Sequence, residues 1–219
     1  MTLSVATVLS VTDDLLLDAS RVRWTVAERI RYMNEAMGAI LNRKPSALQK
    51  RSVVTLVAGT RQSIPSDGSV LLDVVRNFAS DGTTAGRAIR RTDRQLLDDT
   101  DPDWHTTRAK TAIKHFTFDD RAPKDFYCYP PAVAGIKAEV IYAALPTPLA
   151  EDASTGQLEI GAEYQEAVVN YVAYRCNSKD SEFAAPAIAN AFYQAFEAAL
   201  GMKAGADIAA SPNQPGNSV

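Results

Sequence analysis

The residues of this sequence that could do acid–base or metal chemistry are two histidines and several clustered carboxylates. His105 and His115 stand in no spacing typical of a nucleophile or a metal site. Residues 98–103 place aspartates at short spacing, as calcium ligands would be, but they lack the glycine and the distal glutamate of an EF-hand loop. We therefore interpret this run as a solvated loop and predict no catalytic, cofactor or metal residues.

Two further groups have both a structural and a functional interpretation. Asp119, Asp120 and Arg121 form either a charged turn or an acid–base pair, and the turn is favoured because nothing fixes the distance that such a pair needs. A crowded aromatic stretch is either the core of a sheet or a platform on which a ligand stacks, and the core is favoured. Its members are Phe116, Phe118, Phe126, Tyr127 and Tyr129.

Arginines form one basic cluster, at Arg87, Arg90, Arg91 and Arg94. Such a cluster is either a solvated face or a surface that pairs with acidic residues of a neighbouring subunit. The formal net charge of the chain is -3, so it has no basic excess of the kind that a tight nucleic-acid binder needs. DNA that passes nearby without specific binding is compatible with this charge.

Length and composition indicate a globular protein that can bury a normal core, with 219 residues of which 46% are hydrophobic. No apolar run reaches the roughly 20 residues that a membrane span needs, and no basic segment precedes an apolar one at the N-terminus. We therefore expect no membrane association, and synthesis in the cytoplasm. Cys128 and Cys176 are expected to be reduced thiols in or near the core.

The first element that could position these residues is a helix after Trp24. Thr25 and Glu28 have the spacing of a capping box, and apolar residues then recur at spacings of four and three from Val26 to Ile40. Asn42 and Pro45 are expected to close the helix. Before it, residues 13–18 are expected to add one or two helical turns that begin with aspartates.

The middle of the chain, residues 52–146, changes to a β pattern. We predict strands at residues 52–57, 70–78, 87–90, 114–118, 126–129 and 136–145. Asp93 should cap a short helical turn and Trp104 should anchor a loop. Pro130 and Pro131 are expected to end their strand, because proline cannot donate to a ladder.

Helical periodicity returns at about residue 161, with Val168 and Val172 on one face. A second helix should have Pro186 in its first turn, apolar residues every four positions from Ile188 to Leu200, and a stop at Gly201. Its many alanines permit close packing on more than one side, which suggests an assembled context. The remainder has no helical or strand period and is expected to be disordered in isolation.

Together these patterns predict an α+β fold with a helical bundle formed by both ends of the chain. Residues 1–50 and 160–202 make the bundle, residues 51–159 a β-rich insertion, and residues 203–219 an extended C-terminal tail. The bundle needs both ends because neither has an apolar stripe large enough to fold alone.

A pattern spread over nearly the whole chain resembles the head-to-tail adaptor, or connector, proteins of tailed bacteriophages, especially a short-tailed phage adaptor family. Its most characteristic parts are residues 118–119, 123–131 and 142–146. The other segments that match in order and spacing are residues 24–25, 34–36, 43–45, 59–65, 75–77, 102–104, 171–175 and 193–201.

The resemblance implies a structural, non-enzymatic virion protein at the head–tail junction. It implies a homo-oligomeric ring, of twelve copies because the portals of such phages are dodecameric, that docks on the portal protein and joins it to a downstream tail or nozzle protein. DNA would pass through the ring. We expect the helical bundle to form the ring wall and channel, the β insertion to face outward or tailward, and the tail to become ordered on docking. The expected partner interface comprises Lys203, Ile208, Pro212, Gln214, Pro215, Val219, Arg87, Arg90 and Arg91.

Two other functions stay open at this point. Another virion component, such as a tail-completion, tube or baseplate protein, would make mainly β contacts in its ring and none with the portal. A small hydrolase or carbohydrate-binding module would need a pocket that holds His105 or His115 beside the acidic residues.

Overall fold

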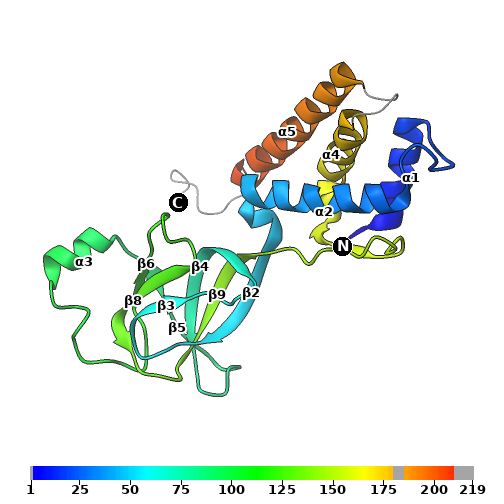
Figure 1. The fold of residues 1–219 in the computed structure, drawn as a ribbon. Helices are drawn as coiled ribbons and strands as arrows, with labels where there is room; N and C mark the ends of the chain where they lie inside the picture. Colours follow the sequence, from blue (N-terminus) through cyan, green and yellow to red (C-terminus); the bar gives the residue numbers. More distant parts are fainter. Residues whose placement is uncertain (1, 180–184, 210–219) are drawn as a thin grey trace. The chain divides into compact units, whose positions relative to one another are not determined.

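A computed structural model describes residues 2–179 and 185–209, and the chain divides into two compact units (Figure 1). Residues 1–47 and 146–219 make the helical unit, and residues 48–145 make the sheet unit. The fold is α+β, as predicted. The predicted insertion, residues 51–159, extends beyond the sheet unit because strand β10 (Gln157–Gly161) pairs with the N-terminal strand β1 (Thr2–Ser4) in the helical unit.

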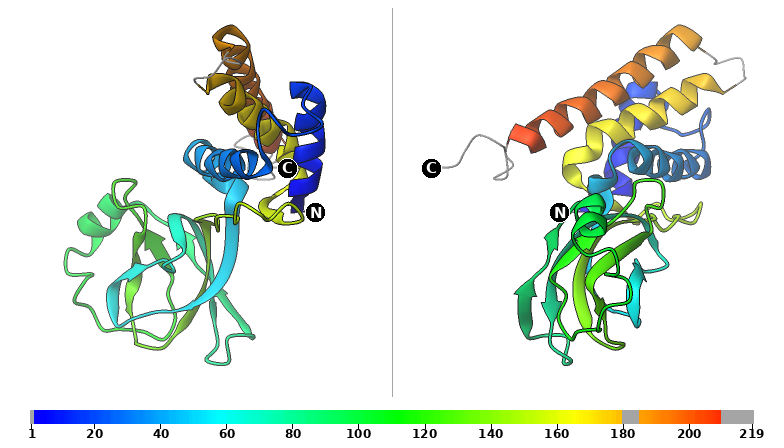
Figure 2. Two further views of the ribbon diagram at one scale, coloured as in Figure 1. Left: turned by 45° about the vertical axis from the view of Figure 1, so that its right-hand side comes forward. Right: turned by 90° about the vertical axis from the view of Figure 1, so that its left-hand side faces the viewer.

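In the helical unit, α4 lies between α1 and α5, and α2 runs across them (Figures 1 and 2). The N-terminal part supplies α1 (Val5–Leu16) and α2 (Val26–Arg43), and the short helix η1 (Pro45–Leu48) leads out of it. The C-terminal part supplies η2 (Ala162–Tyr164), α4 (Gln165–Ser178) and α5 (Pro186–Ala209).

Helix α2 begins as its sequence predicts. The Thr25 hydroxyl accepts the backbone N–H of Glu28, and the Glu28 carboxylate accepts the backbone N–H of Thr25, so the capping box is complete. The apolar stripe is confirmed, because Ile30 and Ile40 are buried together with the methionines between them.

A charged network that the apolar pattern does not predict lies in the same buried face. Arg29 is fully buried, and its guanidinium donates to the carboxylates of Asp13 at 2.5 Å and Asp18 at 3.0 Å. Asp18 also accepts the backbone N–H groups of Val22 and Trp24, both at 3.1 Å. The network therefore fixes the loop between α1 and α2, because its cation, its carboxylates and its backbone donors come from both helices and the loop.

Both carboxylates of this network stay ionised at neutral pH. Burial raises the pKa of Asp13, but hydrogen bonds and charges of Arg21 and Arg29 outweigh it, so that the pKa lies below its ordinary value. Burial likewise opposes the ionisation of Asp18, and the backbone N–H donors with Arg29 lower its pKa overall.

Two predictions for the helical ends were wrong. Helix α1 starts at Val5, so its aspartates stand in the last turn and not at the start; the buried Val5, Val8 and Leu9 make the earlier residues helical. Helix α5 continues beyond Gly201, because its last turns are held by ion pairs of Asp207 with Lys203 and Lys44. Residues 203–209 of the predicted extended tail are therefore helical, and residues 210–219 lie outside the described part.

The sheet unit contains two four-stranded sheets that share one core. The first has the order β2 (Gln49–Thr55), β9 (Lys137–Ala144), β4 (Gly68–Phe78) and β5 (Ala85–Ala88). The second has the order β3 (Gly59–Ser63), β8 (Asp125–Ala132), β7 (His115–Thr117) and β6 (Arg90–Arg91). Neighbouring strands are antiparallel except β6 and β7. The predicted aromatic core is confirmed for Phe116 and Phe126, which are buried between the sheets together with Cys128.

The prolines do not end strand β8, contrary to the prediction. The strand runs through Pro130 and Pro131 to Ala132, because the chain there uses carbonyl acceptors that proline retains: the Lys110 N–H donates to the Pro131 carbonyl at 2.8 Å. Strands β1, β3 and β10 were not predicted. The predicted strand at residues 87–90 is split, since Ile89 turns into the core between β5 and β6.

Replacing Arg29 by methionine should destabilise the chain by ~3–5 kcal/mol, because two carboxylates lose the cation that compensates them inside the protein. Urea unfolding measures the loss. Arg31→Met is the matched control, since Arg31 lies on the same helix, is exposed and reaches Glu151 only at 3.7 Å; it should cost less than about 1 kcal/mol. Equal losses in the two variants would contradict the role of the network.

Acid should remove the same stabilisation. The pKa values of Asp13 and Asp18 are lower in the folded chain than the ordinary 3.8, so these groups stabilise the fold above about pH 4, and the contribution disappears as the pH falls through their folded values. The difference in unfolding free energy between the wild type and Arg29→Met should therefore shrink between pH 6 and pH 3. A difference that stays constant over this range would contradict the assignment.

Candidate assembly surfaces

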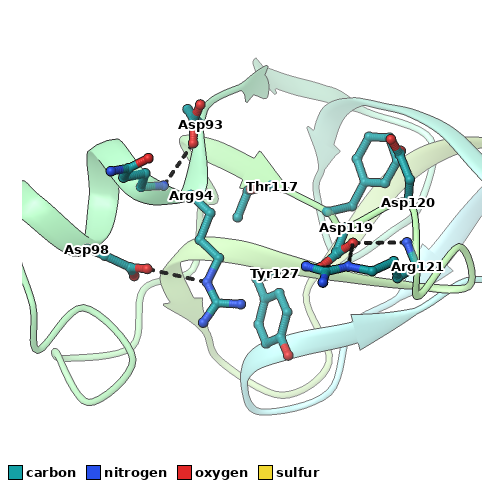
Figure 3. A pocket seen from close by; sticks show the side chains of 10 residues that line it. Asp93, Arg94, Asp98, Thr117, Asp119, Asp120, Arg121 and Tyr127 are labelled. Carbon is teal, nitrogen blue, oxygen red and sulfur yellow. Dashed lines mark hydrogen bonds and ion pairs between the residues drawn. The ribbon is translucent and has the colours of Figure 1, made fainter.

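The sheet unit carries an open, charged cavity of about 440 Å³ beside helix α3 (Arg94–Thr100), which we call the arginine pocket (Figure 3). Asp93 caps α3 as predicted, by accepting the Gln95 N–H at 2.8 Å. The residues that line the pocket are Asp93, Arg94, Gln95, Asp98, Thr117, Phe118, Asp119, Asp120, Arg121 and Tyr127.

Charges in the arginine pocket are arranged as local pairs. Arg94 reaches Asp98 at 3.4 Å and lies over the Tyr127 ring (Figure 3). Arg121 binds Asp119 through its side chain at 2.8 Å and its backbone N–H at 2.9 Å, and these bonds lower the pKa of Asp119 to about 2. The prediction of a charged turn at residues 119–121 is confirmed.

The predicted basic cluster is divided between two strands. Arg87 is in β5, whereas Arg90 and Arg91 are in β6, and all three are exposed. Arg91 lies over the Phe118 ring at 4.6 Å, in a second cavity of about 410 Å³ that shares Arg94 with the arginine pocket. Among the described residues, no carboxylate forms an ion pair with any of the three, so they are available to an acidic partner.

The histidines do not join the acidic residues in this pocket. His105 stacks on Trp104 with a 3.7 Å ring separation and its Nδ1 lies 2.9 Å from the Thr60 hydroxyl. His115 is in β7 and stacks on Tyr129. No group of His, Cys, Asp and Glu that could hold a metal occurs in the described part of the chain. The hydrolase hypothesis requires a pocket with a histidine beside the aspartates, and no histidine lines the arginine pocket.

One wall of the arginine pocket depends on Trp104. This side chain is fully buried, and its indole N–H donates to Asp98 of α3 at 2.8 Å. Its ring also meets the edges of Tyr127 and Tyr129. The prediction that Trp104 anchors a loop is confirmed, and the loop that it anchors carries α3.

The tail residues of the predicted partner interface lie partly in helix α5 and partly outside the described residues. Lys203 lies in α5 and pairs with Asp207 at 2.8 Å, so it is not part of an extended segment. Ile208 belongs to the last turn of α5, and nothing is described of its side chain. Pro212, Gln214, Pro215 and Val219 lie outside the described residues.

A second surface follows the exposed side of α5, where the sequence indicates packing on more than one side through the alanines but does not identify the residues of the surface. Small and apolar residues there recur at spacings of three and four, namely Ile188, Ala191, Ala195, Ala198, Met202 and Gly205. Against Asn170 of α4, the first part of this row forms an apolar groove of about 450 Å³, lined also by Ala187 and Phe192. The spacing was readable in the sequence, but only the structure shows which side of α5 faces solvent.

Comparison with known proteins decides the identity of the chain. A family profile described as SU10 adaptor protein matches residues 3–216. The chain belongs to the SU10 adaptor protein family. No curated protein matches it. The membership agrees with the resemblance to short-tailed phage adaptors. As a member of this family, the chain is a structural protein of a bacteriophage.

The two units of this adaptor differ in charge. The helical unit has 14 Asp and Glu against 9 Lys and Arg, a formal charge of -5, and the sheet unit has 12 against 14, a formal charge of +2. The acidic residues of the helical unit are concentrated at residues 151–166, where five exposed carboxylates occur without any Lys or Arg. No described helix of the adaptor is long and apolar enough to cross a membrane.

Replacing Trp104 by alanine should loosen the wall of the arginine pocket. We expect a loss of ~3–5 kcal/mol and faster tryptic cleavage at Arg108 and Lys110, because the buried ring is the anchor of this loop. Trp104→Phe keeps a six-membered ring in the site but loses the hydrogen bond to Asp98 and leaves a smaller cavity, so it should cost less than Trp104→Ala. A wild-type cleavage rate in Trp104→Ala would show that other contacts hold the loop.

Proposed function

We propose that this protein forms a ring at the head–tail junction of its phage, where it docks on the portal protein, joins it to a downstream tail or nozzle protein and leaves a channel for DNA. The family match to residues 3–216 carries this proposal, because it includes both units of the chain. Twelve copies would match a dodecameric portal.

The acidic helical unit suits the wall of a DNA channel. A negative surface repels the phosphate backbone and therefore lets DNA slide without being held. The formal charge of -5 and the exposed carboxylates of residues 151–166 support this assignment. The helical unit is thus the proposed ring wall.

The sheet unit is the proposed outward or tailward part, and its exposed arginines are the proposed contact. Arg87 and Arg90 have no ion-pair partner within the described chain, and Arg91 is held against Phe118. Arginine binds carboxylates through two parallel hydrogen bonds, which gives both strength and orientation. An acidic surface of the tail protein or of the adjacent subunit would complete these contacts.

The ring hypothesis predicts a defined complex with the portal. Native mass spectrometry of the full-length chain, alone and mixed with the portal protein of the same phage, should show one adaptor copy per portal subunit. Binding to a tail tube or baseplate protein with no binding to the portal would instead favour the other virion component.

The C-terminal residues 210–219 are the proposed portal contact, since many weak copies acting together give high avidity. A chain that ends at residue 209 should unfold at the same urea concentration as the full-length chain and fail to bind the portal. A chain with the ten residues replaced by a glycine–serine segment is the control for length and should fail equally. Undiminished portal binding by both variants would show that the tail is not part of the portal interface.

A further inference from the structure

The apolar groove between α4 and α5 has no charged residue among those that line it. Ile188 is 52% exposed there and Met202, further along the same row, is 66% exposed. The three charged residues of α5 are engaged in ion pairs: Glu197 pairs with Arg43, and Asp207 pairs with both Lys203 and Lys44. This side of α5 therefore has the character of a surface that another protein covers.

A matching protrusion occurs in the same unit, at the loop between α1 and α2. Leu17 is 86% exposed and Val22 is 77% exposed, and they flank a tight turn closed by the Arg21 N–H on the Asp18 carbonyl at 2.9 Å. Together these two side chains form what we call the apolar knob. Two large apolar side chains exposed on the two sides of one turn give a small apolar surface that an interface can bury.

The knob is held rigidly, in a backbone conformation that its residue types do not favour. Leu17 has φ 51° and Arg21 has φ 54°, in the left-handed region where glycine is usual after a helix. The bidentate pair of Arg21 with Asp13 and the backbone bonds to Asp18 fix this conformation. Leu17 thus stands, mostly exposed, where glycine would be less strained, and this favours a role for its side chain in a contact with another molecule.

We propose that the apolar knob of one copy inserts into the apolar groove of the next copy, so that the chain associates head to tail. The proposal rests on the ring function and names the surfaces that would close the ring. Knob and groove are different surfaces, and α1 and α5 lie on opposite sides of α4 (Figures 1 and 2). An interface between two different patches on opposite sides generates a ring or a filament, whereas a self-complementary patch generates a dimer.

The rims of the two surfaces carry opposite charges at one point. Arg23 is exposed next to Val22 of the knob, and Glu166 is exposed on α4 one helical turn before Asn170 of the groove. Such a pair at the rim of an apolar contact favours the correct partner and orientation.

Disulfide trapping tests the contact directly. The variant carrying Leu17→Cys and Ala191→Cys should form covalent dimers and higher multimers under mild oxidation at high protein concentration, and each single variant should form at most background amounts. The native thiols will not interfere, because both are buried and burial raises the pKa of Cys128 to about 11 and of Cys176 to about 12. A ladder no stronger than that of the single variants overturns the proposal, as does a dimer formed by Leu17→Cys alone.

The other possible occupant of the groove is the C-terminal segment of the chain. A double-cysteine chain that ends at residue 209 should cross-link as well as the full-length one. Cross-linking that appears only in the truncated chain would assign the groove of the full-length chain to residues 210–219 and overturn the knob contact. Rings seen by negative-stain electron microscopy without cross-links would overturn this inference and leave the proposed function intact, whereas failure to bind the portal would count against the function itself.

Substitutions of Leu17 separate assembly from folding. Leu17→Gly should raise the urea midpoint of the chain, because glycine suits the left-handed conformation, yet it should weaken self-association by at least about tenfold. Leu17→Glu and Ile188→Lys should each weaken association, and the two together should restore part of it. Leu96→Glu, at an exposed leucine of the sheet unit, is the matched control and should change neither property. Unchanged association in Leu17→Gly and Leu17→Glu would contradict the proposal.

Discussion

The helical unit depends on a buried cation. Arg29 lies among apolar side chains on the inner face of α2, and it is tolerated there because Asp13 and Asp18 supply two carboxylates. Those carboxylates also bind Arg21 and the backbone of the loop, so that one residue of α2 determines how α1 ends and how the chain turns back. The Trp24 indole, which donates to the Cys176 carbonyl at 2.9 Å, ties the same loop to α4.

The sequence predicted the elements whose signals are local. The capping box of α2, the Asp93 cap of α3 and the start of α5 at Pro186 follow from a few neighbouring residues. What it did not predict are features fixed by distant partners. Strand β10 exists because it pairs with β1, more than 150 residues away, and α5 passes Gly201 because Asp207 binds Lys44, which directly follows α2. The prolines of β8 were misjudged for the same reason, since only the pairing shows which backbone donors the sheet requires.

The surfaces were predictable to a smaller extent. The arginine cluster is visible in the sequence. Its division between β5 and β6 depends on the burial of Ile89, and the pocket beside it depends on Trp104, whose partners lie elsewhere in the chain. The groove has a readable spacing from Ile188 onward, and the same spacing would suit a helix face turned inward. The ion pairs of α5 with Arg43 and Lys44 decide between these alternatives, and they become visible only in three dimensions.

Those ion pairs also explain why apolar residues of this unit face solvent. Helix α5 is about 36 Å long, and its two carboxylates bind Arg43 of α2 and Lys44 directly after it, which sets the rotation of the helix about its axis. The remaining side is left with alanine, glycine, isoleucine and methionine. At the opposite side of α4, the buried Arg29 network leaves Leu17 and Val22 outside. The unit thus has an apolar core and exposed carboxylates, as other domains do, but it also leaves two apolar surfaces exposed, which a subunit of an assembly can use.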